Sequence, residues 1–310
     1  MRSIRGVDVA SLGDQFNGYI PGRTLILDGD GPAYRVAATV KRLDTAVRNF
    51  QQEILKQLFM TQSSTAIVHF TASGSKKAGR FLVKAVKPYQ GQRKNKDKPA
   101  LLEPLREAMA HRKNWLPEFE VVLHREREAD DGMIIDAYRL KEHGVIWSDD
   151  KDLQLTPYLY FRKELGVLEG NEPHGWLAEK YTPAGALKII GRGTMFFWCQ
   201  MLMGDSADNV GGIKKFNGAL CGPAGAYKAL QHCKTEHEAA QIVLDAYRRI
   251  DQNPLPEATL LWLLRHPSDS ALQYIWNLAL SAENAAFIQD CVGRDWYHQG
   301  EPIGTEETSP

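Results

Sequence analysis

The chain has 310 residues, with 38 basic and 38 acidic side chains and a hydrophobic fraction of 43%. This length predicts one large domain or two modest ones, and the zero net charge gives no argument from bulk charge for a polyanionic partner. The four cysteines form no CxxC pair, so we expect neither a disulfide framework nor a zinc site. No apolar run is long enough to span a membrane, and the N-terminus lacks a signal-peptide core. We expect a soluble, cytoplasmic protein.

The first predicted strand is the apolar run from Thr24 to Leu27, which ends in Asp28 and an acidic, glycine-rich turn. A buried strand that breaks there places a carboxylate at the edge of a sheet, although Asp28 could instead cap a following helix. Apolar spacing predicts helical structure over residues 33–60 and a second strand over 66–70. Within that strand, we expect His69 to be a packed or edge residue.

Residues 76–98 form a basic segment with nine lysines and arginines and a single acid, Asp97. Such a segment neutralises phosphates readily, and the interleaved Phe81 and Tyr89 offer stacking surfaces for an unpaired base. The alternative is a solvated surface loop.

Residues 120–156 are rich in carboxylates that follow two apolar runs. Periodicity predicts a strand near 121–123, an amphipathic helix near 133–138 and a strand at 145–147, which together make a βαβ unit. Its acids are expected at the carboxyl ends of the strands, where ligand sites of open α/β sheets form. Crowding like charges there is costly without cations, and oxygen ligands favour Mg²⁺ or Mn²⁺. The acids are Glu128, Asp130, Asp131, Asp149, Asp150 and Asp152.

Most of the chain beyond residue 194 is predicted to be helical. Residues 158–194 are interrupted by glycines and prolines and give no clear pattern, whereas 195–203 is typical of a helix. Asp205 and Asp208 follow it three residues apart, either on one helical face or as a cap. The glycines beyond them predict hairpins whose backbone amides can meet a phosphate. Further helices are expected over 239–247, 258–264 and 271–280, and the polar tail 301–310 is expected to be disordered.

Three motifs in this order resemble the flap endonuclease and 5′-exonuclease superfamily. They are 128-EADD-131, 148-SDDKDLQL-155 and 204-GDSADNVGGI-213, which are similar to that family's EADD, SxDxDxxQL and GDxSDNIPGI motifs. The second motif is one residue shorter here before Gln154, which leaves its acids in register. The similarity covers roughly residues 24–235. A PIN-like, mostly parallel sheet flanked by helices is the α/β fold that the resemblance implies.

The resemblance also implies a domain organisation. Residues 24–198 would form the catalytic domain, with a helical arch at 76–98 that threads single-stranded DNA, where 89-YQGQR-93 looks like the phage-type YKxxR pattern. Residues 199–300 would contain a helix–hairpin–helix element, often with a K⁺ ion, and further helices.

Carried over residue by residue, eight carboxylates would hold two Mg²⁺ or Mn²⁺ ions, directly or through water, and act in catalysis: Asp28, Glu128, Asp130, Asp131, Asp150, Asp152, Asp205 and Asp208. A second set would bind DNA: Arg35, Lys84, Lys87, Tyr89, Arg93, Lys94, Lys214, Lys215 and Lys228.

Two departures from the family pattern stand out. The family usually has an aspartate just after the second strand, near residues 71–73, and this chain has Thr71, Ala72 and Ser73 there. It also usually has a lysine after the arch tyrosine, where this chain has Gln90. Asp30 is the candidate substitute for the first, and Lys87 or Lys94 for the second. In addition, residues 214–223 make a longer hairpin than is usual.

The sequence therefore predicts a monomeric, metal-dependent 5′-3′ exonuclease or flap endonuclease. Its partners would be DNA 5′ ends, flaps and single-strand–duplex junctions, in DNA replication or repair. The arch pattern and compact length favour a phage origin, and hence the host cytoplasm. One alternative is a structure-specific DNA-binding protein with weak hydrolysis, because of the two departures. Another is a PIN-like ribonuclease, to which a duplex-binding hairpin would be superfluous.

Overall fold

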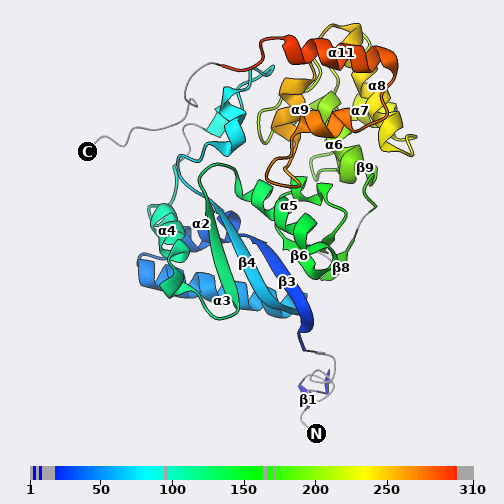
Figure 1. The fold of residues 1–310 in the computed structure, drawn as a ribbon. Coiled ribbons are helices and arrows are strands. Elements are labelled where there is room, and N and C mark those ends of the chain that lie inside the picture. The colour runs from blue at the N-terminus through cyan, green and yellow to red at the C-terminus, as the bar shows by residue number, and fades with distance from the viewer. Residues whose placement is uncertain are drawn as a thin grey trace.

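The computed structural model describes residues 3–4, 7–8, 18–93, 97–162, 166–170 and 172–298. It contains a six-stranded sheet, seen in the lower half of Figure 1. Its strand order is β5-β4-β3-β6-β7-β8, and β8 alone is antiparallel to its neighbour. The expected α/β fold with a mostly parallel sheet is confirmed. The strands are β3 (Ile20–Asp28), β4 (Ser63–Thr71), β5 (Phe119–His124), β6 (Gly144–Trp147), β7 (Leu159–Arg162) and β8 (Val167–Glu169). Near the N-terminus, β1 (Ser3–Ile4) pairs with β2 (Val7–Asp8).

Helices cover both faces of the sheet. Side chains alternate along each strand, so neighbouring residues pack against different helices. Leu25 and Leu27 pack with α2 (Asp30–Thr39), α3 (Leu43–Thr61) and α4 (Leu102–Ala110), whereas Ile26 between them packs against α5 (Ala129–Leu140). All three side chains are fully buried, which is worth about 1.5–3 kcal/mol for each. His69, as expected, is a packed residue.

The helical region expected over 33–60 consists of two helices, α2 and α3. The hydroxyl of Thr39 donates to the carbonyl groups of Arg35 and Val36 at the end of α2, and Val40 is extended, with φ −124° and ψ 160°. A β-branched pair whose hydroxyl competes for helical carbonyls favours this break.

Helix α5 connects β5 to β6, but these strands are not neighbours in the sheet. Strands β4 and β3 lie between them, so the chain first builds outward from β3 to β5 and then returns to the other side of β3. This reversal makes a topological switch point between β3 and β6, and ligands of open α/β sheets bind outside the strand ends at such a point.

The basic segment differs from the expected helical arch. Its described residues form two 3-10 helices, Lys77–Leu82 and Gly91–Arg93, and no α-helix. Ala78 and Gly79 have φ values of 53° and 77° inside the first, and this left-handed backbone interrupts regular helix. Lys94, which was expected to bind DNA, lies outside the described residues.

The region that sequence periodicity did not resolve contains β8 and an antiparallel hairpin. Strands β9 (Trp176–Tyr181) and β10 (Leu187–Arg192) pair in a separate two-stranded sheet. Strand β9 is largely exposed and β10 is buried mainly at its end, so neither shows the regular alternation that identifies a strand in sequence.

The C-terminal helices gather around a second, larger core (Figure 1). At its centre lies α6 (Gly193–Met203), a helix that is buried all round, as its uniformly apolar sequence requires. The others are α7 (Pro223–Leu230), α8 (Glu236–Arg249), α9 (Leu255–Leu261), α10 (Ala271–Trp276) and α11 (Ala282–Gly293). None of the helices in the described ranges is both long and apolar enough to cross a membrane. The tail 301–310 lies outside those ranges.

Candidate metal centre

The switch point between β3 and β6 carries the first group of carboxylates. Asp28 ends β3, and its Oδ2 accepts a hydrogen bond of 2.7 Å from the hydroxyl of Ser148, which follows β6. The Ser148 oxygen in turn accepts the backbone N–H of Asp150 at 3.0 Å, and Asp150 Oδ1 accepts the N–H of Asp152 at 2.9 Å. This chain of short-range hydrogen bonds fixes the turn after β6 against the end of β3.

Asp30 places a further carboxylate beside this group, at the end of β4. Its oxygens accept the backbone N–H of Thr71 at 3.1 and 3.3 Å, and Arg106 pairs with Oδ1 at 2.8 Å. Gly29 makes this approach possible, because a Cβ there would lie 2.6 Å from the ring of Phe70. Burial raises the pKa of Asp30 to about 6, against the opposing pull of Arg106.

Asp130, in the first turn of α5, is the most strongly perturbed acid. Burial raises its pKa well above the usual range, and the charges of Asp150 and Asp28 raise it further. The pKa of Asp150 is also raised, first by burial. Carboxylates that raise one another's pKa in this way are stabilised by a cation placed among them.

Asp131 is fully buried and is held by the basic segment. Its two oxygens accept hydrogen bonds of 2.7 and 2.8 Å from Arg80, and Oδ1 also accepts the N–H of Leu264. The pKa of Asp131 is lowered, because Arg80 and these hydrogen bonds outweigh burial. Its carboxylate therefore joins the basic segment to the C-terminal region.

Glu128 caps α5 and is also held by the basic segment. Its carboxylate accepts the hydroxyl of Tyr89 at 2.6 Å and lies 3.2 Å from both Arg80 and Lys77. Gln90 bridges from Glu128 Oε1, at 3.3 Å, to Asp208 Oδ1, at 2.9 Å. The ammonium of Lys77 lies against the Gln90 side-chain oxygen, so Lys77, not Lys87, is the lysine beside Gln90 in the described chain.

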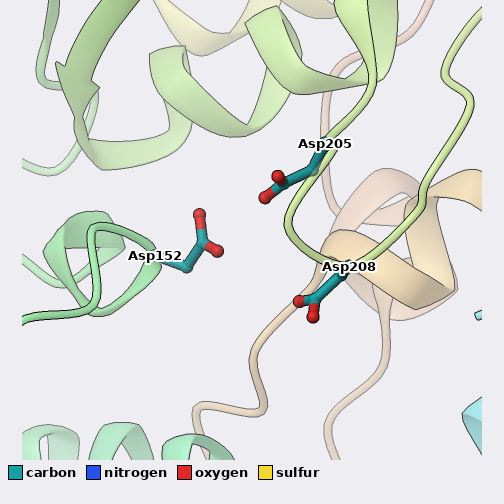
Figure 2. Close-up of side chains that lie close together, drawn as sticks. All are labelled: Asp152, Asp205 and Asp208. Atoms are coloured by element: carbon teal, nitrogen blue, oxygen red, sulfur yellow. The ribbon is translucent and has the colours of Figure 1, made fainter. Parts of the chain in front are cut away.

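A second group of carboxylates comes from the turn after β6 and the loop after α6. Each of Asp152, Asp205 and Asp208 offers an oxygen within 4.8 Å of the others. Figure 2 shows their side chains facing a common space from two segments far apart in sequence. Gln200, on α6, donates to Asp152 Oδ1 at 2.9 Å and to Asp205 Oδ2 at 3.2 Å, and Lys151 contacts the same two carboxylates.

The donor atoms of both groups fit hard divalent cations. All are carboxylate oxygens, which Mg²⁺ and Mn²⁺ prefer. The amide of Gln200 is 1% exposed, and its Oε1 has no hydrogen-bond partner in the described structure. A buried acceptor of this kind is costly unless a cation or its bound water satisfies it.

The residues expected to bind DNA are distributed unevenly. Arg35 is exposed near the first acid group, 3.5 Å from Asp149, and Lys84 pairs with Asp295 at the surface. Tyr89 is 6% exposed, so its ring offers no stacking face in this structure. The side chain of Arg93 lies outside the described ones, and the remaining lysines are exposed: Lys87, Lys214, Lys215 and Lys228.

Solved structures of bacteriophage T5 proteins share the fold of this chain. The D15 protein of bacteriophage T5, crystallised with metal ions, matches at a TM-score of 0.51 and 16% identity, over 87% of this chain and 98% of that one. The fold is that of this T5 protein. The T5 5′-exonuclease with bound zinc matches at 0.50, and a T5 flap endonuclease complex with DNA and metal ions at 0.51, with the same identity and coverage. No family model and no curated protein matches the sequence.

Several residues that contact the acids in the structure were not among the site residues predicted from the sequence. Arg80 was assigned to the basic segment, and no local sequence signal indicates its buried role, because its partner Asp131 is 51 residues away. Lys151 lies between two aspartates of the second acidic motif, and this position indicates that it contacts the acids. Ser148 and Gln200 are neutral, so only the tertiary structure indicates their contacts.

Proposed function

We propose that this chain is a divalent-metal-dependent 5′ nuclease that cleaves DNA near 5′ ends, flaps or single-strand–duplex junctions. The observation that carries the proposal is the convergence of acids from β3, β6, α5 and the loop after α6 at the switch point of the sheet. Similar structures of T5 proteins contain metal ions and, in one case, DNA.

The acids divide into two cation positions. Asp28, Asp130 and Asp150 would hold one ion, with Asp30 beside them, and Asp152, Asp205 and Asp208 would hold the other. Bound ions of this kind activate water and stabilise the charge of a leaving oxygen. Glu128 and Asp131 would act indirectly, because both are held by Arg80.

The chain's own cations would position the DNA backbone. Arg35 is exposed beside the first position, and Lys87 lies on the basic segment that contacts Glu128 through Tyr89. Lys214, Lys215 and Lys228 are exposed on the loop after α6 and on α7, where they would contact phosphates of a duplex arm. Backbone contacts carry no base information, so sequence preference is expected to be slight.

The finer assignments belong to the same proposal. We assign Mg²⁺ or Mn²⁺ as the ions, a K⁺ ion to the helix–hairpin–helix element, and a monomeric protein in replication or repair of phage DNA. All four cysteines are free thiols, which supports a reducing, cytoplasmic compartment.

The test is cleavage of a 5′-labelled flap duplex and a blunt duplex with Mg²⁺, with Mn²⁺ and with chelator. We expect metal-dependent release of short 5′ products. Asp130→Ala and Asp150→Ala should abolish cleavage and leave DNA binding largely intact, because they remove ligands and not phosphate contacts. Comparable cleavage by both variants and the wild type would refute the two-ion assignment.

A second candidate function is supported by Gln90. It stands where the family has an arch lysine, and it is 7% exposed and bonded to Glu128 and Asp208. A neutral, buried side chain there cannot steer a phosphate, which favours a structure-specific DNA-binding protein with weak hydrolysis. Salt-sensitive binding of flap DNA without product in either metal would identify this alternative.

A further inference from the structure

Lys151 places its ammonium between two carboxylates of the second cation position. Nζ lies 2.6 Å from Asp205 Oδ2, and 2.9 and 3.1 Å from the two oxygens of Asp152. Asp152 and Asp205 are the residues assigned to a divalent ion together with Asp208. A lysine ammonium is a compact point charge with three donors, so it occupies the location and the contacts of a small cation.

The Lys151 ammonium and the two carboxylates that it contacts stabilise each other's charged forms. Burial alone would lower the pKa of Lys151, but Asp152 and Asp205 outweigh it and raise the pKa. Lys151 lowers the pKa of Asp205 against the effect of burial, and Ala207 N–H contributes to the same effect. The pKa of Asp152 is nevertheless raised to about 6, because burial and the charges of Asp150 and Asp205 outweigh the effect of Lys151.

Two ligands of the first cation position, Asp130 and Asp150, have no such contact: in the described part of the chain, no ion pair joins Lys or Arg to either. The strongest charges acting on Asp130 are negative, and Arg106 and Lys151 act only on its neighbours Asp30 and Asp150. The two positions are therefore unequal in the metal-free protein. One is a cluster of mutually repelling acids, and the other is already occupied by a cation.

We propose that Lys151 is a tethered counter-ion of the Asp152–Asp205–Asp208 position, which a divalent ion must displace in order to bind. This inference rests on the proposed metal site. It makes this position the weaker of the two, since binding there breaks the contacts of the ammonium. The lysine can leave, because its side chain is 32% exposed and its stem is flexible. Gln200 remains as the neutral donor that holds Asp152 and Asp205 together.

The test is Mn²⁺ binding without DNA, measured by electron paramagnetic resonance of free Mn²⁺. Lys151→Met keeps the length of the side chain and removes the charge. We expect the dissociation constant of the weaker Mn²⁺ site to fall by at least about fivefold. This is the lower end of the range for coupled sites. The metal-free variant should also unfold at a lower temperature, because Asp152, Asp205 and Asp208 then repel one another without compensation.

Two control variants separate charge from structure. Lys76→Met removes a surface lysine that pairs with Glu126, and should leave both dissociation constants unchanged. Lys151→Arg keeps the positive charge and should not tighten binding. Unchanged or weaker Mn²⁺ binding in Lys151→Met would overturn the proposal.

A measurement on the wild type covers the case in which the variant does not fold. Reductive methylation of lysines, followed by mass spectrometry, should modify Lys151 slowly in chelator and faster with saturating Mg²⁺. Equal rates would overturn displacement. Neither experiment requires cleavage of DNA, so an inactive protein that passes both would refute the proposed nuclease and leave this inference standing.

Discussion

The carboxylate of Asp30 accepts the backbone N–H of Thr71 at the end of β4. Thr71 begins the stretch in which the 5′-nuclease pattern has an aspartate and this chain has none. A side chain from the turn after β3 thus reaches the location that a residue after β4 would otherwise occupy. Asp30 also adds to the charge that raises the pKa of Asp130, so it lies close enough to act on the same cation.

The first prediction concerns this carboxylate. Asp30→Asn should weaken Mn²⁺ binding at the first position, and lower any metal-dependent cleavage, by about 10–100-fold, as for residues that support metal ligands. Asp44→Asn is the matched control, because Asp44 is an exposed acid paired with Arg42. If both variants bind Mn²⁺ as the wild type does, Asp30 has no part in the site.

The second prediction concerns the buried pair of Arg80 and Asp131. Arg80→Met should lower the free energy of unfolding by about 3–5 kcal/mol, because it leaves Asp131 charged and buried without its partner. Guanidinium denaturation measures this change. Arg125→Met is the control, since Arg125 forms an exposed pair with Glu107 that is worth about 0–1 kcal/mol. Equal losses in the two variants would contradict the structural role of Arg80.

The third prediction concerns Gly132, on the face of α5 that meets β4 and β5. A Cβ at this position would lie 2.3 Å from His124 Nε2 and 2.8 Å from His69 Nδ1. Gly132→Ala should therefore destabilise the protein by about 1–3 kcal/mol, as overpacking does, despite the better helix propensity of alanine. Gly293→Ala, which has open space around it, should not destabilise. Thermal unfolding of both variants provides the comparison.

The fourth prediction is a pH dependence of stability in chelator. The pKa of Asp30 is about 6 in the folded protein and about 3.9 in an unfolded chain. The folded state therefore binds the extra proton, so the stability contribution is complete below about pH 4 and is lost as pH rises through about 6. The melting temperature of the wild type minus that of Asp30→Asn should fall between pH 4.5 and pH 7.

His124 contributes the opposite slope in both proteins. Burial lowers its pKa to about 4, so folding is favoured as pH rises from there to the ordinary value of histidine. Because the wild type and Asp30→Asn share this ring, the difference between their melting temperatures removes its effect. A difference that is flat with pH would show that Asp30 does not titrate as the structure implies.

The local sequence determines several strands and helices of the fold and the identity of the candidate carboxylates. The apolar runs before Asp28 and Asp150 predict buried strands that end in acids, and the uniformly apolar segment before Gly204 predicts α6. Residue type and position along a strand are local properties, and period-2 and period-3.6 patterns report them directly. The α/β class and the candidate carboxylates follow from the sequence for this reason.

Tertiary structure alone decided which of these acids meet and which cations meet them. Asp30 reaches Thr71, Arg80 reaches Asp131, and Lys151 bridges Asp152 to Asp205. Apart from Lys151 and its neighbour Asp152, these partners are 41 to 54 residues apart. Their contact depends on strand order and on where the C-terminal helices pack. No local pattern encodes that order, because the burial of each strand is satisfied equally well by several neighbours.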